Sequence, residues 1–153
     1  MASPDSVGQY YLDSFGNGRI GSAQVVSMAT AGNAVVSIPI LTGGLTNSGN
    51  ITGSGSVIIR RVTANNPSGT VASAYVSITT SNDGNASNAV VANVALSNLS
   101  AVGLYQDLTI ATPYSTTTAI TGNKTQALYV NVNVPSGNAN TVSFQVYGDV
   151  VTF

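Results

Sequence analysis

The sequence predicts an all-β protein: an antiparallel β-sandwich of about eight strands. Three observations lead to this prediction. Short runs rich in Val, Ile and Tyr recur along the chain, clusters of Gly, Asn, Ser and Pro separate them, and no helix of normal length is evident. Strands at such regular spacing are typical of antiparallel sandwiches and barrels.

The strands are expected in eight segments with turn signals between them. Their ranges are 23–29, 34–41, 56–64, 70–80, 88–97, 103–112, 126–134 and 141–152. In the seventh segment Leu128, Val130, Val132 and Val134 are expected to face inward, and Tyr129, Asn131 and Asn133 outward. In the eighth segment Val142, Phe144, Val146 and Val150 are expected to share one face. This alternation indicates a sheet with one face on the core and the other toward solvent or a partner.

The chain is expected to form one sandwich domain, residues 23–153, after an extended N-terminal arm, residues 1–22. The stretch Phe15–Gly21, "FGNGRIG", has the G-x-G-x-x-G spacing of a dinucleotide-binding loop. However, the residues after Gly21 have the β-branched pattern of strands, and no carboxylate stands about twenty residues on to hold a ribose. We therefore expect no nucleotide and no other cofactor.

The same glycines, Gly16, Gly18 and Gly21, are instead expected to act as a hinge for the arm. Tyr10, Tyr11 and Phe15 are then the expected anchors of the arm on a partner, with Arg19 fixing it through a carboxylate or carbonyl groups.

Charged residues make up only 6% of the chain, and the formal net charge is −1. Four scattered cations cannot supply the basic patch that nucleic-acid binding needs. No apolar run is long enough to span a membrane as a helix, and the N-terminal residues lack the features of a signal peptide. A nearly neutral surface suggests a protein that packs against copies of itself or against other partners.

The sequence does not favour an enzyme, because the chain has no His, no Cys and no Glu. Glycoside hydrolysis would need two nearby Asp carboxylates, and although any two of the five could meet in the folded chain, this interpretation is not favoured. Asp83 lies in an Asn-Asp-Gly-Asn turn, where hydrogen bonding to the backbone is favoured over calcium binding. No catalytic or metal residues are therefore expected.

Arg60 and Arg61 stand next to each other in an otherwise apolar strand sequence, "SVIIRRVT". Neighbouring residues of a strand point to opposite faces, so one arginine should reach solvent or a partner and the other must find Asp or carbonyl oxygens. We favour an edge strand or a bulge that places both in water, and we count both among the candidate interface residues.

The last residues, "FQVYGDVVTF", alternate and end in Phe153, as the last strand of a bacterial outer-membrane barrel does, but this interpretation is not favoured. The chain as a whole lacks Cys, His and Trp, is rich in Asn, Ser, Thr and Gly, and carries the segment "SPDSVGQYYLDSFGNGRIGS" before its strands. In these respects it resembles virion structural proteins of tailed phages, especially of marine and cyanobacterial phages. Among those proteins it is most similar to capsid decoration (cement) proteins and to tail or fibre head domains.

That resemblance implies a β-sandwich or jelly roll that oligomerises, often as a trimer, on a particle surface. We therefore expect a non-enzymatic decoration protein on the virion capsid, made in the host cytoplasm, with the major capsid protein and copies of itself as partners. The alternative is a fibre head or carbohydrate-binding adhesin that stacks sugars on exposed tyrosines. The candidates for that role are Tyr75, Tyr105, Tyr114, Tyr129 and Tyr147, although packing on a sheet face is the favoured interpretation of these residues.

Overall fold

A computed structural model describes residues 18–40, 44–45, 51–52, 55–111, 118–120 and 126–152. This part of the chain is built from strands, together with one short 3₁₀ helix, η2 (Ala86–Asn88), and no α-helix occurs in it. The strands are β1 (Gly18–Ser27), β2 (Gly32–Ile40), β3 (Gly44–Leu45), β4 (Ile51–Thr52), β5 (Gly55–Asn65), β6 (Tyr75–Thr79), β7 (Ala89–Ala95), β8 (Tyr105–Leu108), β9 (Thr118–Ile120), β10 (Gln126–Val134) and β11 (Thr141–Thr152).

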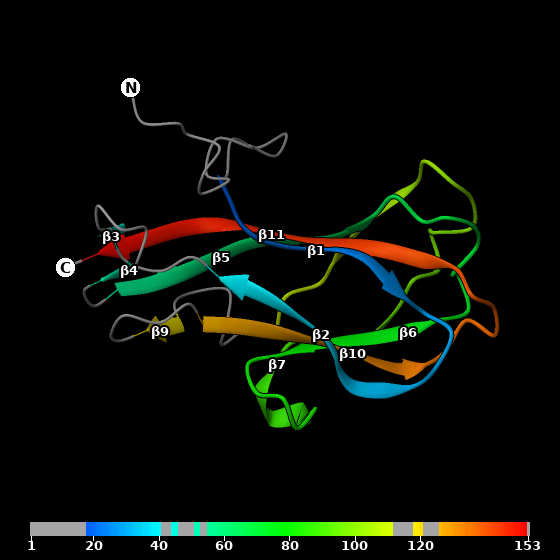
Figure 1. The fold of residues 1–153 in the computed structure, drawn as a ribbon, viewed down its shortest axis with the longest axis horizontal. Coiled ribbons are helices and arrows are strands. Elements are labelled where there is room, and N and C mark those ends of the chain that lie inside the picture. The colour runs from blue at the N-terminus through cyan, green and yellow to red at the C-terminus, as the bar shows by residue number, and fades with distance from the viewer. Residues whose placement is uncertain are drawn as a thin grey trace.

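Two antiparallel sheets form the layers of a sandwich (Figure 1). The first sheet has the strand order β1-β11-β5-β8, with β9 also paired to β5, and the second has the order β2-β10-β6-β7. The pairs are nested along the chain, since β1 pairs with β11, β2 with β10, β5 with β8 and β6 with β7. The predicted all-β antiparallel sandwich is thus confirmed.

The core lies between the inner faces of the two sheets. Phe144 on β11, Ile38 on β2 and Ile78 on β6 are fully buried there, and Met28 closes the end of the core beyond β1. These positions follow the period-two alternation of the sequence, because inward side chains of both sheets exclude water while the intervening residues face outward. The alternation predicted for the last two long strands matches the burial of Leu128, Val130, Val132, Val142, Phe144 and Val146. It is wrong for Val134, which is 46% exposed where the ladder with β6 shifts after Val132.

The start of the sandwich lies earlier in the chain than expected. β1 begins at Gly18, and Ile20 belongs to the buried core, so residues 18–22 are part of the sheet rather than of an arm. The hinge proposed at Gly18 and Gly21 is wrong for the same reason, because both residues pair with β11. An isolated Gly inside a strand marks a bulge as readily as a hinge, and a bulge does lie between Arg19 and Gly21.

The segments expected as long strands at 70–80 and 103–112 are mostly loop. β6 begins only at Tyr75, because a tight turn precedes it in which Ala74 N–H donates to the Val71 carbonyl. Val71 and Ala74 are nevertheless fully buried. Alternation placed Ala74 on the inward face, but it placed Val71 on the opposite face, and this is wrong because the turn brings Val71 into the core as well.

The two sides of the sandwich are closed differently. On one side the chain crosses from the first sheet to the second just after β8, where Ile110 forms a bridge with Val91 of β7 and Ala111 N–H donates to the Val90 carbonyl. On the other side lie β1 and β2, the terminal strands of the two sheets. Among the described strands, none bridges the edges of β1 and β2 on that side.

Candidate functional site

The outer face of the first sheet gathers polar and aromatic side chains, and we call this set the polar face. Its members are Arg19, Ser22, Arg61, Thr63, Asn65, Tyr105, Asp107, Ser143, Gln145 and Tyr147. Two cross-strand rows organise it. Arg19, Tyr147 and Arg61 form one row, and Ser22, Gln145, Thr63 and Asp107 form the other. Side chains directly opposite one another on a sheet face are in contact range, and Thr63, in the middle of the second row, is only 4% exposed.

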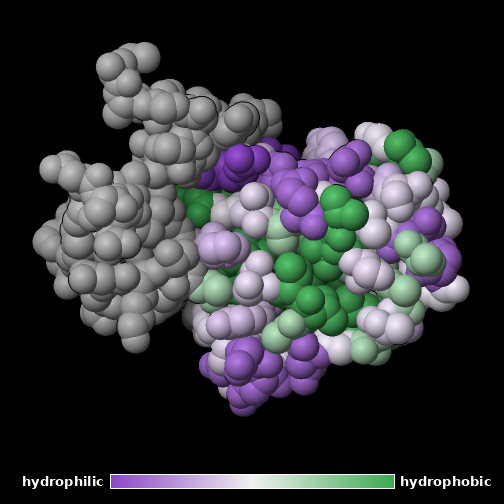
Figure 2. Space-filling model, in the orientation of Figure 1, coloured by the Kyte–Doolittle hydropathy of each residue, from purple (hydrophilic) through white to green (hydrophobic). Residues whose placement is uncertain are grey.

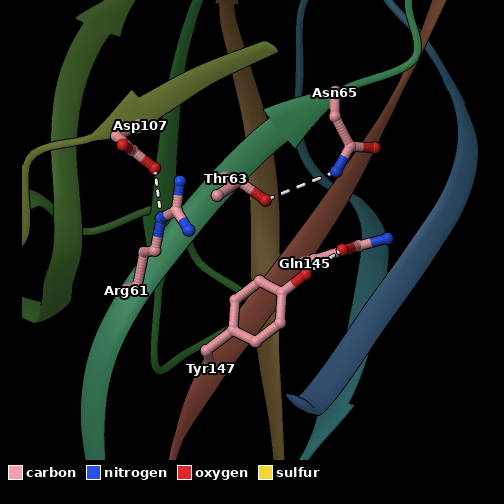
Figure 3. Close-up of polar contacts among 6 residues, drawn as sticks. All are labelled: Arg61, Thr63, Asn65, Asp107, Gln145 and Tyr147. Atoms are coloured by element: carbon pink, nitrogen blue, oxygen red, sulfur yellow. Dashed lines mark hydrogen bonds and ion pairs between the residues drawn. The ribbon is translucent and has the colours of Figure 1, made fainter. Parts of the chain in front are cut away.

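The polar face contains an ion pair. Arg61 Nε lies 2.5 Å from Asp107 Oδ1, and the Arg61 side chain is only 14% exposed, whereas that of Asp107 is 53% exposed (Figure 3). The Arg61 guanidinium carbon also lies 6.0 Å from the centre of the Tyr105 ring. The pair cancels its own charge, and an exposed pair of this kind contributes about 0.2–1 kcal/mol. The pair therefore fixes Arg61 on the polar face and neutralises its charge there.

A β-bulge decides which arginine joins this face. In the β5–β11 ladder Arg61 is opposite Tyr147 and Ile59 is opposite Gly148, so Arg60 is the extra residue. Arg60 is exposed, as expected for a bulge. The expectation that both arginines would lie in water is wrong for Arg61, because β5 is an interior strand and its neighbour β8 supplies Asp107.

Two further hydrogen bonds join polar side chains of this face. The Tyr147 hydroxyl donates to Gln145 Oε1, and Asn65 Nδ2 donates to Thr63 Oγ1 over 3.4 Å (Figure 3). Tyr105 stands at the start of β8 and is 61% exposed. It is therefore the aromatic ring that this face offers most openly to a partner.

The outer face of the second sheet is also polar, but much of it is buried. Asn131 is fully buried. Its Oδ1 accepts from Ala34 N–H at 2.7 Å, and its Nδ2 donates to Thr79 Oγ1 at 3.0 Å. The expected outward direction of Asn131 is right, but its expected exposure is wrong. The reason is the bulge in β2, where the N–H of Ala34 points toward the Asn131 side chain and donates to its oxygen.

Asp83 lies in the turn before η2, and its carboxylate serves that turn. Its Oδ1 accepts from Ser81 Oγ at 2.5 Å and from Asn85 N–H at 3.0 Å. The Ser81 hydroxyl, followed by the Asn85 amide, lowers the pKa of Asp83 below its usual 3.8. The turn role predicted for Asp83 is thereby confirmed.

A groove lined by both polar and apolar side chains lies between the edges of β1 and β2. It has a volume of about 370 Å³ and is lined by Gln24, Val25, Val26, Ser27, Thr30, Val35 and Val36. Val25 is 68% and Val35 39% exposed, and Figure 2 shows a hydrophobic surface between the two strands on this side. Val25 also has a φ of +56°, an unfavourable backbone conformation for a β-branched residue.

The sequence-predicted site residues do not all gather in one place. Arg19 and Arg61 belong to the polar face and Arg60 to its bulge, whereas Tyr10, Tyr11 and Phe15 lie outside the described residues. The tyrosines proposed for an adhesin divide between the sheets. Tyr105 and Tyr147 are on the first, Tyr75 and Tyr129 are on the second, and Tyr114 lies outside the described residues.

Sequence reasoning missed Asp107, Gln145 and the groove. The groove did have a signal, because Val25-Val26 and Val35-Val36 are adjacent pairs and neighbouring strand residues point to opposite faces. One valine of each pair must therefore leave the core. No comparable signal links Arg61 to Asp107, which are 46 residues apart in the chain.

Comparison of the chain with models of protein families, with curated proteins and with solved structures gives no match. Within the described residues, no three His, Cys, Asp or Glu side chains are grouped so that they could hold a metal ion. In the same part of the chain, no helix has the length and apolar character that crossing a membrane would require.

Proposed function

We propose that this chain is a non-enzymatic structural protein of a tailed-phage virion, a capsid decoration protein that binds the shell through its polar face. The observation that carries the proposal is the exposed Tyr105 beside the internally neutralised pair Arg61–Asp107. Such a surface binds by shape, hydrogen bonds and aromatic contact rather than by net charge, as interface centres generally do.

Two further features support the proposal. The nested strand pairing agrees with a jelly-roll-like arrangement of two four-stranded layers, the fold that the resemblance to virion proteins implies. The scarcity of charge, five Asp against four Lys and Arg, favours self-association over a free monomer, and we propose a homo-oligomer, a trimer by the resemblance.

The experiment places the protein in the particle. Cryo-electron microscopy of purified virions should show it on the capsid surface in hundreds of copies. A few copies at a tail tip would favour the adhesin instead, and absence from the particle would refute both.

Attachment is then measured with purified protein and capsids that lack it. Tyr105→Ser should weaken binding about tenfold or more, as loss of a central aromatic anchor does. The matched control is Tyr75→Ser, which removes a 39%-exposed tyrosine from the start of β6 on the other sheet and should leave binding unchanged.

A second candidate function rests on the same face. Tyr105, together with the amide groups of Gln145 and Asn65, offers an aromatic ring and neutral hydrogen-bonding groups on one sheet surface, which suits an uncharged sugar. A glycan array separates the two candidates. Specific sugar binding that is lost in Tyr105→Ser favours the adhesin, whereas no sugar binding together with tight capsid binding favours the decoration protein.

A further inference from the structure

The loop between β7 and β8 carries apolar side chains into solvent. All six residues of the stretch 100–105 are exposed, and Val102 is 66% and Leu104 39% exposed. Between these two lies Gly103 at a φ of +83°, where an added methyl group would meet no atom within 4 Å. We call residues 101–104 the tip, because at Gly103 the loop stands clear of its surroundings.

The base of the tip is fixed, so the tip is held in one position. Leu99, just before the tip, is fully buried, and its carbonyl accepts from Val71 N–H at 2.9 Å. Just after the tip, the buried Gln106 side chain accepts from Asn98 N–H at 3.0 Å and donates to the Ala95 carbonyl at 2.7 Å. An apolar surface that is already ordered loses little conformational freedom when a partner covers it, which favours binding.

The groove between β1 and β2 lies on the other side of the sandwich from the tip. In the two strand orders β1 and β2 stand at one end, and β8 and β7 stand at the other. The groove has a volume of about 370 Å³, four of its seven lining residues are valines, and none of the seven is charged. The tip contains no charged residue either. A charged group buried against either surface would lose its hydration without gaining an opposite charge, so each surface suits an uncharged, apolar partner.

The tip is the exposed apolar surface of the described residues that best fits such a groove. Tyr75 and Val134 belong to the strands β6 and β10, and Tyr105 belongs to the polar face. The tip, in contrast, lies in a loop at the end of the sandwich where the β10–β11 turn also lies (Figure 1). We propose that the tip of one copy of this chain inserts Val102 and Leu104 into the groove of the next copy.

The symmetry of the assembly follows from where the two surfaces lie. Because tip and groove are different parts of the molecule, the contact is heterologous, and each copy offers its tip to one neighbour and its groove to another. Such contacts close into a ring when the rotation between copies completes a full turn. A contact between the sides of the sandwich leaves the polar face uncovered. The inference rests on the homo-oligomer of the proposed function and names the surfaces through which its copies meet.

Two single cysteine variants test the contact, since the chain has no cysteine of its own. Val102→Cys on the tip and Val35→Cys in the groove are co-expressed with different affinity tags and oxidised mildly after purification. We expect a disulfide-linked heterodimer, because the contact brings the two positions together. Each variant expressed alone should give no cross-link, because tip does not meet tip and groove does not meet groove.

The matched control replaces Val102→Cys by Ala92→Cys, since Ala92 is exposed on β7 but lies outside the tip and should not cross-link to Val35→Cys. A disulfide-linked dimer of Val102→Cys alone would overturn the proposal in favour of a two-fold contact between tips. Absence of the heterodimer, or an equal yield with Ala92→Cys, would also overturn it.

Sedimentation of the protein without cysteines gives a second measurement. Val102→Ser should weaken the association between copies about tenfold or more, as loss of a central apolar contact does. The matched control Val134→Ser removes a 46%-exposed valine from β10 and should leave association unchanged.

The outcomes separate this inference from the proposed function. An oligomer that is as stable in Val102→Ser as in the unchanged protein would overturn the contact between tip and groove and leave the proposed homo-oligomer standing. A monomer of the unchanged protein at tens of micromolar would overturn both. Attachment to the shell is measured separately, through Tyr105→Ser.

Discussion

Gly148→Ala tests the bulge that directs Arg61 to the polar face. A Cβ built at Gly148 would lie 2.0 Å from the backbone oxygen of Ile58, 3.0 Å from its carbonyl carbon and 3.2 Å from Ile59 Cα. All three neighbours are backbone atoms of the adjacent strand, so no flexible side chain can move aside. Gly148 is not among the residues with positive φ, and the cost is therefore contact rather than backbone strain.

The size of the effect can be worked out from this distance. Ordinary contact needs about 3.4 Å or more, so β5 and β11 must separate by more than 1 Å at the centre of the first sheet. Overpacking alone costs about 1–3 kcal/mol, and each ladder hydrogen bond that weakens adds about 1 kcal/mol. We expect a loss of about 3–4 kcal/mol, or a fall in Tm of about 10 °C for a chain of this length.

Urea unfolding followed by circular dichroism measures this loss. The matched control is Gly103→Ala, which places the same methyl group in open space at a φ of +83° and should cost only about 1–2 kcal/mol. If Gly148→Ala unfolds within about 0.5 kcal/mol of the unchanged protein, the β5–β11 register is wrong, and the placement of Arg61 fails with it.

Three further predictions concern single side chains. Asn131→Asp should destabilise the protein by about 1–3 kcal/mol at pH 7 but not below about pH 4. Burial beside the Tyr129 carbonyl raises the pKa of the new carboxyl, and only its protonated form can donate a hydrogen bond to Thr79. Urea unfolding at several pH values measures this difference. The pKa of Asp83 is lowered in the folded protein, so the stabilisation by its carboxylate is complete above about pH 4 and is lost as the pH falls through that folded-state pKa. Asp83→Asn should therefore weaken the fall of the free energy of unfolding at acid pH. An NMR titration that places the pKa of Asp83 at or above 3.8 would contradict the turn geometry. Val25→Asn should raise the free energy of unfolding by about 1 kcal/mol, because Asn tolerates the positive φ of this position better than Val does. The control Val35→Asn should give no such gain. Equal effects of the two substitutions would refute the backbone strain at Val25.

The fold was predictable because it depends on local patterns. Alternation located Leu128, Val130 and Phe144 in the core, and Gly, Asn and Pro clusters separated the strands. The start of β1 was not predictable in this way, since Gly18 and Gly21 have low strand propensity and are held by pairing with β11, more than a hundred residues later. Long-range pairing also decided the burial of Asn131.

The candidate site was only partly predictable, for a related reason. The sequence identified Arg60 and Arg61 as unusual, but which of them joins the polar face depends on a single bulge opposite Gly148. The partner of Arg61 comes from β8, and that contact exists only because the chain order places β8 beside β5. Local sequence determines which residues are available, and sheet order determines which of them meet.

The distribution of charge connects the fold to the proposed interactions. In the described ion pair, Asp107 neutralises Arg61 next to the exposed Tyr105, so Arg61 does not need an oppositely charged group from a partner. An interface of this kind should depend little on ionic strength, because screening weakens net charges at a distance more than it weakens shape and hydrogen bonding. Capsid binding should therefore change less than about threefold between 50 mM and 500 mM NaCl, and a salt-sensitive attachment would point to a charged surface other than the polar face.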